Sequence, residues 1–213
     1  MLTLYDYLPS QNGWKVRQLL RHLAIPHRTK IISIFEGAGQ SPAYLAINPW
    51  GAVPAIRLGD GRVLSESNAI LWYLSEGTKY RPDEAFAQAK VLQWLSFEAD
   101  YVQASMGSLR FWTLTGKLSA RSPSLVDGKR AIAVRALGIL EREFSSRPFI
   151  AGEVYSIADI SLFAYAHLAN DAGIATDGFR SFEAWIARVK CQEGHLAEMF
   201  PYSIDPHSSA EPP

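Results

Sequence analysis

The sequence contains a single cysteine, Cys191, and no long apolar run. One cysteine excludes an internal disulfide, which is typical of proteins kept in a reducing compartment, so we expect a cytoplasmic protein. The first residues show no basic segment followed by an apolar one, so we expect no secretory signal. No stretch approaches the roughly 20 apolar residues that a membrane span requires, so we expect no membrane partner.

An excess of charge of one sign is also lacking, because 21 Lys and Arg residues balance 21 Asp and Glu residues. This balance does not favour nucleic acid or an anionic membrane surface as a partner. The five histidines lack the spacing of metal ligands, and no Gly-rich phosphate loop is present, so we expect no metal. The 48% content of hydrophobic residues is that of a globular protein, and the length allows one domain or two small ones.

Two short segments carry most of the functional information. Between Asn48 and Pro54, the sequence predicts a cis bond after Val53, because cis peptide bonds are nearly confined to proline. The Val53 backbone would then point outward and pair with an extended peptide, as an added strand does. Between Glu66 and Ile70, an acid and a hydroxyl stand where an amphipathic helix begins, and free N–H groups there bind carboxylates. The segments predict a site for a short peptide, although the second is also compatible with a plain helix cap.

At these positions the chain resembles the glutathione transferase family. Three matching segments occur in the family's order: Asn48–Pro54, Glu66–Ile70 and Phe149–Ile160. The resemblance extends over nearly the whole chain, from Leu2 to about Met199. The resemblance implies a detoxification enzyme with glutathione as its co-substrate. Such an enzyme activates the glutathione thiol as a thiolate, which then attacks a small hydrophobic electrophile. The resemblance also implies a homodimer.

The hydrophobic pattern predicts an α+β fold with a thioredoxin-like N-terminal domain. Residues 1–78 show a strand, a helix, a second strand, a short helix, a hairpin and a last helix in that order. Residues 79–84 are polar and are expected to form a linker.

The remainder predicts an all-α C-terminal domain over residues 85–200, followed by an extended tail at 201–213. Small and apolar residues at spacings of three and four predict the buried face of a long helix: Ala85, Ala89, Leu92, Ser96, Ala99, Val102, Met106 and Leu109. Ser156 and Asp159 have the spacing of a capping box, with Asp in place of the usual Glu.

The thiol chemistry is predicted at the start of the first helix. A thioredoxin-like redox domain has Cys-x-x-Cys there, whereas this chain has Ser10-Gln11-Asn12-Gly13, so a ligand must supply the thiol. A thiol with a pKa of about 8.5 is only a few per cent thiolate at neutral pH. A hydroxyl donor and a helix N-terminus both favour the anion. We predict Ser10 as the donor and Asn12 as the second choice, with helix capping as the alternative role of Ser10.

The segment from Ser10 to Arg17 is similar to the serine-type classes of the family. Zeta-type members have a cysteine at the position of Asn12, so this chain departs from them. The Ser-x-Asn pattern resembles the nu-type enzymes, which reduce disulfides. Tyr7 is the remaining alternative, because tyrosine-type classes place their hydroxyl at the end of this strand, but we favour packing for it.

The resemblance assigns the glutathione backbone to Val53-Pro54 and its γ-glutamyl group to Glu66-Ser67. Family members often hold the glycine carboxylate with a basic residue, where this chain has Gln40 and Ala52. We therefore expect an affinity for glutathione weaker than low micromolar.

The hydrophobic substrate pocket is expected between the two domains. Its candidate residues are Tyr7, Tyr101, Met106, Arg110, Phe111 and Trp112. For each of them taken singly, packing within its own strand or helix is the favoured alternative. Trp50 occupies a position where some classes insert an aromatic residue into the partner subunit.

Two other functions remain open. One is a nu-type glutathione-dependent disulfide reductase or peroxidase. The other is a non-catalytic binding module that keeps the fold, since one fold serves many functions.

Overall fold

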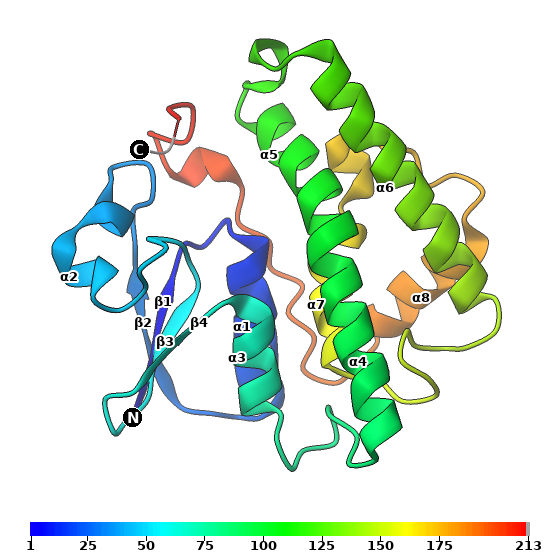
Figure 1. Ribbon diagram of the computed structural model, residues 1–213, viewed down its shortest axis with the longest axis horizontal. Helices are drawn as coiled ribbons and strands as arrows, with labels where there is room; N and C mark the ends of the chain where they lie inside the picture. The colour runs from blue at the N-terminus through cyan, green and yellow to red at the C-terminus, as the bar shows by residue number, and fades with distance from the viewer. Residues whose placement is uncertain (212–213) are drawn as a thin grey trace. The chain divides into compact units, whose positions relative to one another are not determined.

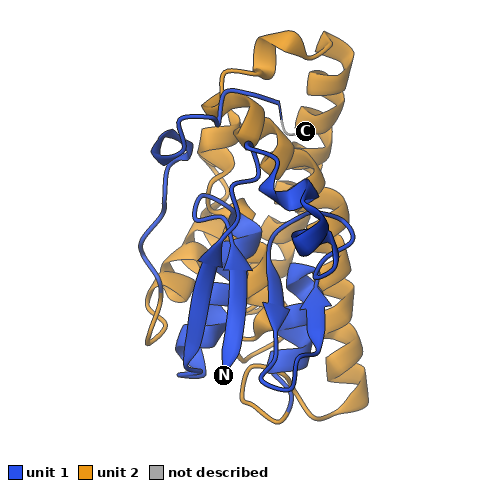
Figure 2. Cartoon of the chain, turned by 90° about the vertical axis from the view of Figure 1, so that its left-hand side faces the viewer, with its two compact units in different colours: residues 1–76, 196–213 blue, residues 77–195 orange. Residues whose placement is uncertain are grey.

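The computed structural model describes residues 1–211, which divide into two compact units (Figure 2). Unit 1 comprises Met1–Glu76 and the C-terminal segment that begins at Leu196, and unit 2 comprises Gly77–His195. The predicted domains differ from these units mainly at residues 196–200, which leave the helical unit. Two side chains of the first helix explain the difference, because Trp14 Nε1 donates to Leu196 O at 3.2 Å and Leu196 N–H donates to Gln18 Oε1 at 2.7 Å.

Unit 1 is built on a four-stranded mixed sheet with the order β2-β1-β3-β4 (Figure 1). The first two strands are parallel, and the other pairs are antiparallel. Its strands are β1 (Leu2–Asp6), β2 (His27–Ile31), β3 (Ala55–Arg57) and β4 (Val63–Ser65). Its helices are α1 (Gln11–His22), the 3-10 turn Ala38–Gln40, α2 (Pro42–Leu45), α3 (Ser67–Leu74) and the 3-10 turn Tyr202–Ile204. This order confirms the predicted α+β fold with a thioredoxin-like layout.

Alternating residues of β1 supply the two cores of unit 1. Leu4 packs with Val16 of α1 and Ile70 of α3, whereas Tyr5 packs with Tyr44 of α2 on the opposite face of the sheet. Figure 1 shows the same arrangement, with α1 and α3 on one side of the sheet and α2 on the other. Successive side chains of a strand point to opposite faces of the sheet, so β1 contributes to both cores. The packing of Leu4 against Val16 holds α1 on one of these faces.

Unit 2 is helical throughout, as predicted. Its helices are α4 (Ala85–Phe97), a π-helix (Glu98–Gly107), α5 (Ser108–Leu114), α6 (Pro123–Phe144), α7 (Ile157–Ala166) and α8 (Arg180–Lys190), with 3-10 turns at Leu118–Ala120 and Ala169–Ala172. None of the helices described within residues 1–211 has the length and apolar character needed to cross a membrane.

The predicted buried face of the long helix is wrong in its first half. The predicted residues within α4, with Ala99 beyond it, are exposed: Ala85, Ala89, Leu92, Ser96 and Ala99. The core side is formed by larger residues at the same spacing: Val91, Trp94, Leu95 and Glu98. Both faces fit a helical period, so spacing alone did not choose between them. The second half of the prediction is confirmed, since the buried residues there include Val102, Met106 and Leu109. The π-helix between the two halves has i→i+5 hydrogen bonds, which rotate the side chains that follow relative to those of α4.

The predicted capping box starts α7. Ser156 Oγ accepts from Ala158 N–H at 3.3 Å, and the Asp159 carboxylate accepts from Ser156 N–H at 3.1 Å. Asp159 also accepts from Ile150 N–H at 2.9 Å and from Trp185 Nε1 at 3.0 Å, and it is fully buried. One side chain thus joins the start of α7, the preceding loop and α8.

Candidate functional site

The loop between β1 and α1 places Ser10 at the start of the first helix. Ser10 is the N-cap of α1, and its Oγ accepts from Gly13 N–H at 3.2 Å. Ser10 N–H donates to Tyr7 O at 2.8 Å, which closes the loop. Because Oγ is engaged as an acceptor, its own proton remains available for a ligand at the positive end of the helix.

A buried ion pair between β1 and α1 holds this loop in place. Asp6 at the end of β1 is fully buried and pairs with Arg17 of α1, which also donates from Nη2 to Leu8 O at 3.0 Å. Tyr7 N–H donates to Asp6 Oδ1 at 2.8 Å. Burial raises the pKa of Asp6, and the Arg17 guanidinium opposes that shift. A Cβ on Gly13 would lie 1.9 Å from Asp6 Oδ1, so the helix can approach the carboxylate only because this residue is glycine.

A second helix N-terminus meets the first at Ser67. Ser67 Oγ donates to Asn12 Oδ1 at 3.3 Å, which links α3 to the first turn of α1. The preceding residue, Glu66, is exposed and has φ of 68°. A positive φ in a non-glycine residue is uncommon and marks functional positions often enough to support a binding role for Glu66. The structure therefore brings Ser10, Asn12 and Ser67 together.

The Val53–Pro54 bond is cis, as predicted. The carbonyl oxygen of the preceding Ala52 accepts from Tyr44 Oη and from Asn48 Nδ2, both at 2.7 Å. This loop also touches Gln40, since a Cβ on Gly51 would lie 2.5 Å from Gln40 Nε2. Gln40 is exposed and thus lies beside the loop that is predicted to bind glutathione.

Tyr7 is a poor candidate for the thiol donor. It is 4% exposed, its ring packs edge-on against Phe35, and its centroid lies 6.5 Å from that of Tyr202. Burial, followed by the nearby Asp205 carboxylate, raises the pKa of Tyr7 well above its usual range. A phenol with a raised pKa is a weaker hydrogen-bond donor to a thiolate, which favours Ser10.

The other predicted pocket residues lie in unit 2, and the structure gives several of them packing roles. Met106 is in the core, which corrects the prediction that it lines a pocket. Arg110 is almost as buried, and its Nε donates to Asp171 Oδ2 at 3.1 Å. Tyr101 is partly exposed and stacks on Phe97, with ring centroids 5.1 Å apart. The Phe111 ring lies 4.3 Å from Lys117 Nζ.

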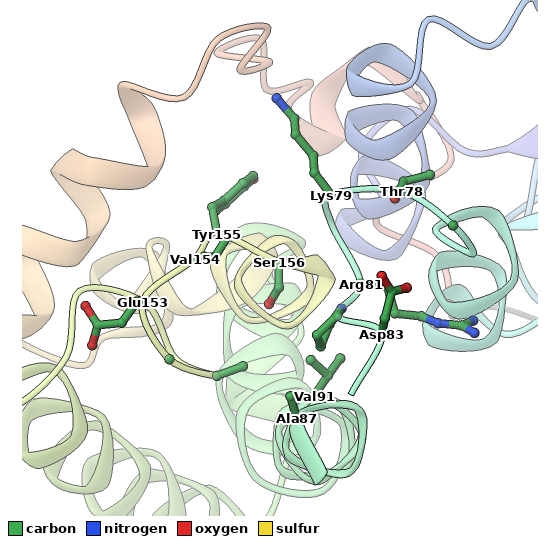
Figure 3. A pocket seen from close by; sticks show the side chains of 14 residues that line it. Thr78, Lys79, Arg81, Asp83, Ala87, Val91, Glu153, Val154, Tyr155 and Ser156 are labelled. Carbon is green, nitrogen blue, oxygen red and sulfur yellow. The ribbon is translucent and has the colours of Figure 1, made fainter. Parts of the chain in front are cut away.

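Two cavities differ in their relation to the site. One, of about 510 Å³, lies in unit 2 beside the start of α4 and the capping box, and charged residues of both signs line it (Figure 3). It contains none of the residues predicted to bind glutathione. Another, of about 270 Å³, lies in unit 1 against the loop that carries Ser10. Within residues 1–211, no group of three or more His, Cys, Asp or Glu side chains is arranged to hold a metal ion.

Family models match both parts of the chain. The N-terminal domain of glutathione S-transferase matches residues 9–76, and its C-terminal domain matches residues 123–188. The human protein "Glutathione S-transferase theta-2" is 31% identical over 91% of this chain and 85% of its own length. The chain belongs to the glutathione S-transferase family.

Further comparisons give one more curated relative and two solved structures that are similar to this chain. "Disulfide-bond oxidoreductase YfcG" of Escherichia coli strain K12 is 25% identical over 89% of this chain and 90% of its own length. A glutathione S-transferase structure from Pseudomonas fluorescens Pf-5 has a TM-score of 0.88 and 34% identity, covering 92% of this chain and 97% of that one. A glutathione transferase structure from Burkholderia graminis, with two glutathione molecules bound per subunit, has a TM-score of 0.80 and 28% identity, covering 91% and 85%.

The family assignment confirms the predicted resemblance. The named relatives support the predicted glutathione transferase enzyme, with glutathione as its co-substrate. The sequence analysis did not predict the support that Asp6 and Arg17 give to the loop, because the pair is formed by residues of two different elements. Nor did it predict the contacts of the C-terminal segment, whose Pro- and Ser-rich composition indicates only an extended chain.

Proposed function

We propose that this protein is a glutathione transferase in which Ser10 stabilises the glutathione thiolate. The observation that carries the proposal is the meeting of two helix N-termini through Asn12 and Ser67, with Ser10 at one of them. The γ-glutamyl carboxylate would bind at the N-terminus of α3, and the peptide backbone would pair with Val53. The thiol would then lie at the N-terminus of α1.

The chemistry of this site is proton loss from a bound thiol. The thiol proton leaves to solvent, and Ser10 donates a hydrogen bond from its hydroxyl to the resulting thiolate while its oxygen accepts from Gly13 N–H, so each hydrogen bond strengthens the other. The partial positive charge of α1 adds to the stabilisation of the anion. The thiolate then forms a carbon–sulfur bond with an electrophilic carbon of a small apolar substrate, and a leaving group departs from that carbon with its bonding electron pair. Holding the two reactants together lowers the barrier further.

A disulfide reductase is the second candidate. The Ser10 and Asn12 pair favours it, because the Asn12 amide nitrogen is a second donor available to a thiolate when its oxygen accepts from Ser67. The similar protein YfcG is named as a disulfide-bond oxidoreductase. A non-catalytic module is the third possibility, and absence of glutathione binding would favour it.

Calorimetric titration tests the proposed site directly. We expect binding of glutathione, weaker than low micromolar because Gln40 is the only side chain proposed for the glycine carboxylate. The dipeptide Cys-Gly is the matched control, and its binding should be undetectable because it lacks the γ-glutamyl group proposed to bind at Glu66 and Ser67. Tighter binding of glutathione disulfide would favour the reductase. Equal binding of glutathione and Cys-Gly would contradict the proposed role of α3.

We also propose that the protein acts as a homodimer in a reducing, cytoplasmic compartment. The exposed side of α4 is unusually apolar for a solvated face, with Leu92 45% exposed and Phe86 70% exposed. The alanines at positions 85 and 89 would let a second helix approach closely. Trp50, 68% exposed in unit 1, remains a further candidate for the interface.

Replacing Leu92 with glutamate is expected to convert the dimer into a monomer, because it places a charge within an apolar contact. Light scattering after size exclusion would show the mass falling by half. Val134→Glu on α6 is the control, since Val134 is 53% exposed and lies outside the proposed interface. A wild-type protein that is monomeric at micromolar concentration would contradict the proposal.

A further inference from the structure

The 270 Å³ cavity of unit 1 shares a loop with the proposed thiol site. The residues Tyr7, Leu8 and Pro9 line it, and Pro9 directly precedes Ser10. The rest of the wall comes from residues 31–36, at and after the end of β2, and from residues 204–207 of the C-terminal segment. A group bound in this cavity would therefore lie next to the thiol that Ser10 is proposed to activate.

Several contacts fix the C-terminal segment over the cavity. The guanidinium carbon of Arg17 lies 5.7 Å from the centroid of the Phe200 ring. His207 Nε2 lies 3.3 Å from Glu36 Oε1, and Ser33 Oγ donates to the other oxygen of Glu36. His207 N–H donates to Asp205 Oδ1 at 2.9 Å, which orients that carboxylate. The wall is thus a defined surface and not a loose end of the chain.

The charge of this wall is negative. Glu36 and Asp205 supply two carboxylates, and the His207 imidazole is the one basic side chain among the lining residues. The lining residues, all within the described part of unit 1, include neither Lys nor Arg. The net charge is therefore negative whether or not the imidazole is protonated. Aliphatic side chains complete the wall, among them Ile31 and Ile204.

One buried polar group in the wall can serve a ligand as an acceptor. Tyr7 Oη is shielded from solvent and lies by the Asp205 carboxylate, towards which its hydroxyl hydrogen can point. The Tyr7 oxygen accepts a hydrogen bond from no group among residues 1–211, so a ligand with a polar donor head would supply that bond. The lining thus offers carboxylates, a hydroxyl oxygen and an apolar rim.

We propose that this cavity binds a second substrate that carries an ammonium group on a short apolar body. The inference rests on the proposed function, because it assumes that glutathione occupies the neighbouring site. Glu36 and Asp205 attract the ammonium group, Tyr7 Oη accepts a hydrogen bond from it, and the aliphatic rim contacts the body. Electrophiles of this class are preferred to neutral or anionic ones of the same size.

The test uses three small ligands that differ in charge and little in shape: benzylammonium, benzyl alcohol and benzoate. Each is titrated by calorimetry into protein saturated with S-methylglutathione, which cannot react. We expect benzylammonium to bind about three- to tenfold more tightly than benzyl alcohol, and benzoate to bind most weakly, because the carboxylates are partly exposed to solvent. The preference should shrink with added salt.

Two variants make the test specific. Glu36→Gln/Asp205→Asn keeps the acceptor oxygens and removes both charges, so the preference should disappear. Asp60→Asn/Asp177→Asn removes the same charge at exposed positions outside the cavity and should leave it unchanged. Equal binding of the three ligands, no binding of any, or a preference that survives in the first variant would overturn the proposal. Failure of S-methylglutathione itself to bind would instead count against the proposed function.

Discussion

Ser10→Ala is expected to lower kcat/KM with glutathione by about 100-fold or more at pH 7, because one preorganised donor to a developing anion has an effect of that size. The alanine variant loses the Ser10 hydroxyl at the start of α1. The oxygen of that hydroxyl accepts from Gly13 N–H, which leaves its hydrogen available for the thiolate. The pKa of the bound thiol should rise towards about 8.5, the value of a free thiol. The pKa of the bound thiol is measured from the ultraviolet absorbance of the thiolate as a function of pH.

The sign of the pH effect follows from that shift. In wild type, a lowered thiol pKa keeps the rate nearly constant above that pKa. In Ser10→Ala, the thiolate fraction at pH 7 falls to a few per cent, so the rate should climb with pH until about 8.5. The defect should therefore be large at pH 7 and much smaller at pH 9.

Two further substitutions separate catalysis from helix capping. Ser10→Thr keeps both the hydroxyl and the cap and should retain most activity. Ser10→Gly removes the hydroxyl but costs only a few tenths of a kcal/mol as a cap, so it should be nearly as stable as wild type and as inactive as the alanine variant. An unchanged thiol pKa in Ser10→Ala would transfer the role to Asn12, whose amide is the other donor at this turn.

Sequence patterns predicted the parts of this site that depend on local chemistry. The Val53–Pro54 bond and the Ser156–Asp159 capping box were both found, because each is determined by a few adjacent residues. The conformation of Glu66, with its positive φ, was not predicted. It depends on how α3 begins against the first turn of α1, which is a matter of tertiary packing.

Features that depend on distant residues were predicted less well. On α4, two faces share the same periodicity, and the larger side chains at Val91 and Trp94 occupy the core because burying them removes more apolar area from water. Likewise, nothing in the sequence of the tail predicts that Asp205 lies near Tyr7. Such contacts arise only when the sheet has formed and the chain returns to it.

Asp159→Ala is expected to reduce the free energy of unfolding by about 4 kcal/mol or more, since it leaves several buried donors without an acceptor at about 1–3 kcal/mol each. The donors that lose this acceptor are Ile150 N–H, Ser156 N–H, the Ser156 hydroxyl and Trp185 Nε1. Burial raises the pKa of Asp159 to about 6, so the experiment belongs at pH 8, where the carboxylate is ionised. Urea unfolding provides the free energy.

Glu84→Ala is the matched control. Glu84 caps α4 by accepting from Phe86 N–H and Ala87 N–H, both at 2.8 Å, but the site is exposed, so water replaces the lost acceptor. Its loss should cost about 1 kcal/mol. The two carboxylates accept from the same number of backbone donors, and therefore the difference between the variants measures what burial and the side-chain bonds from Ser156 and Trp185 add. Equal costs would show that Asp159 acts as an ordinary cap and does not join α7 to α8.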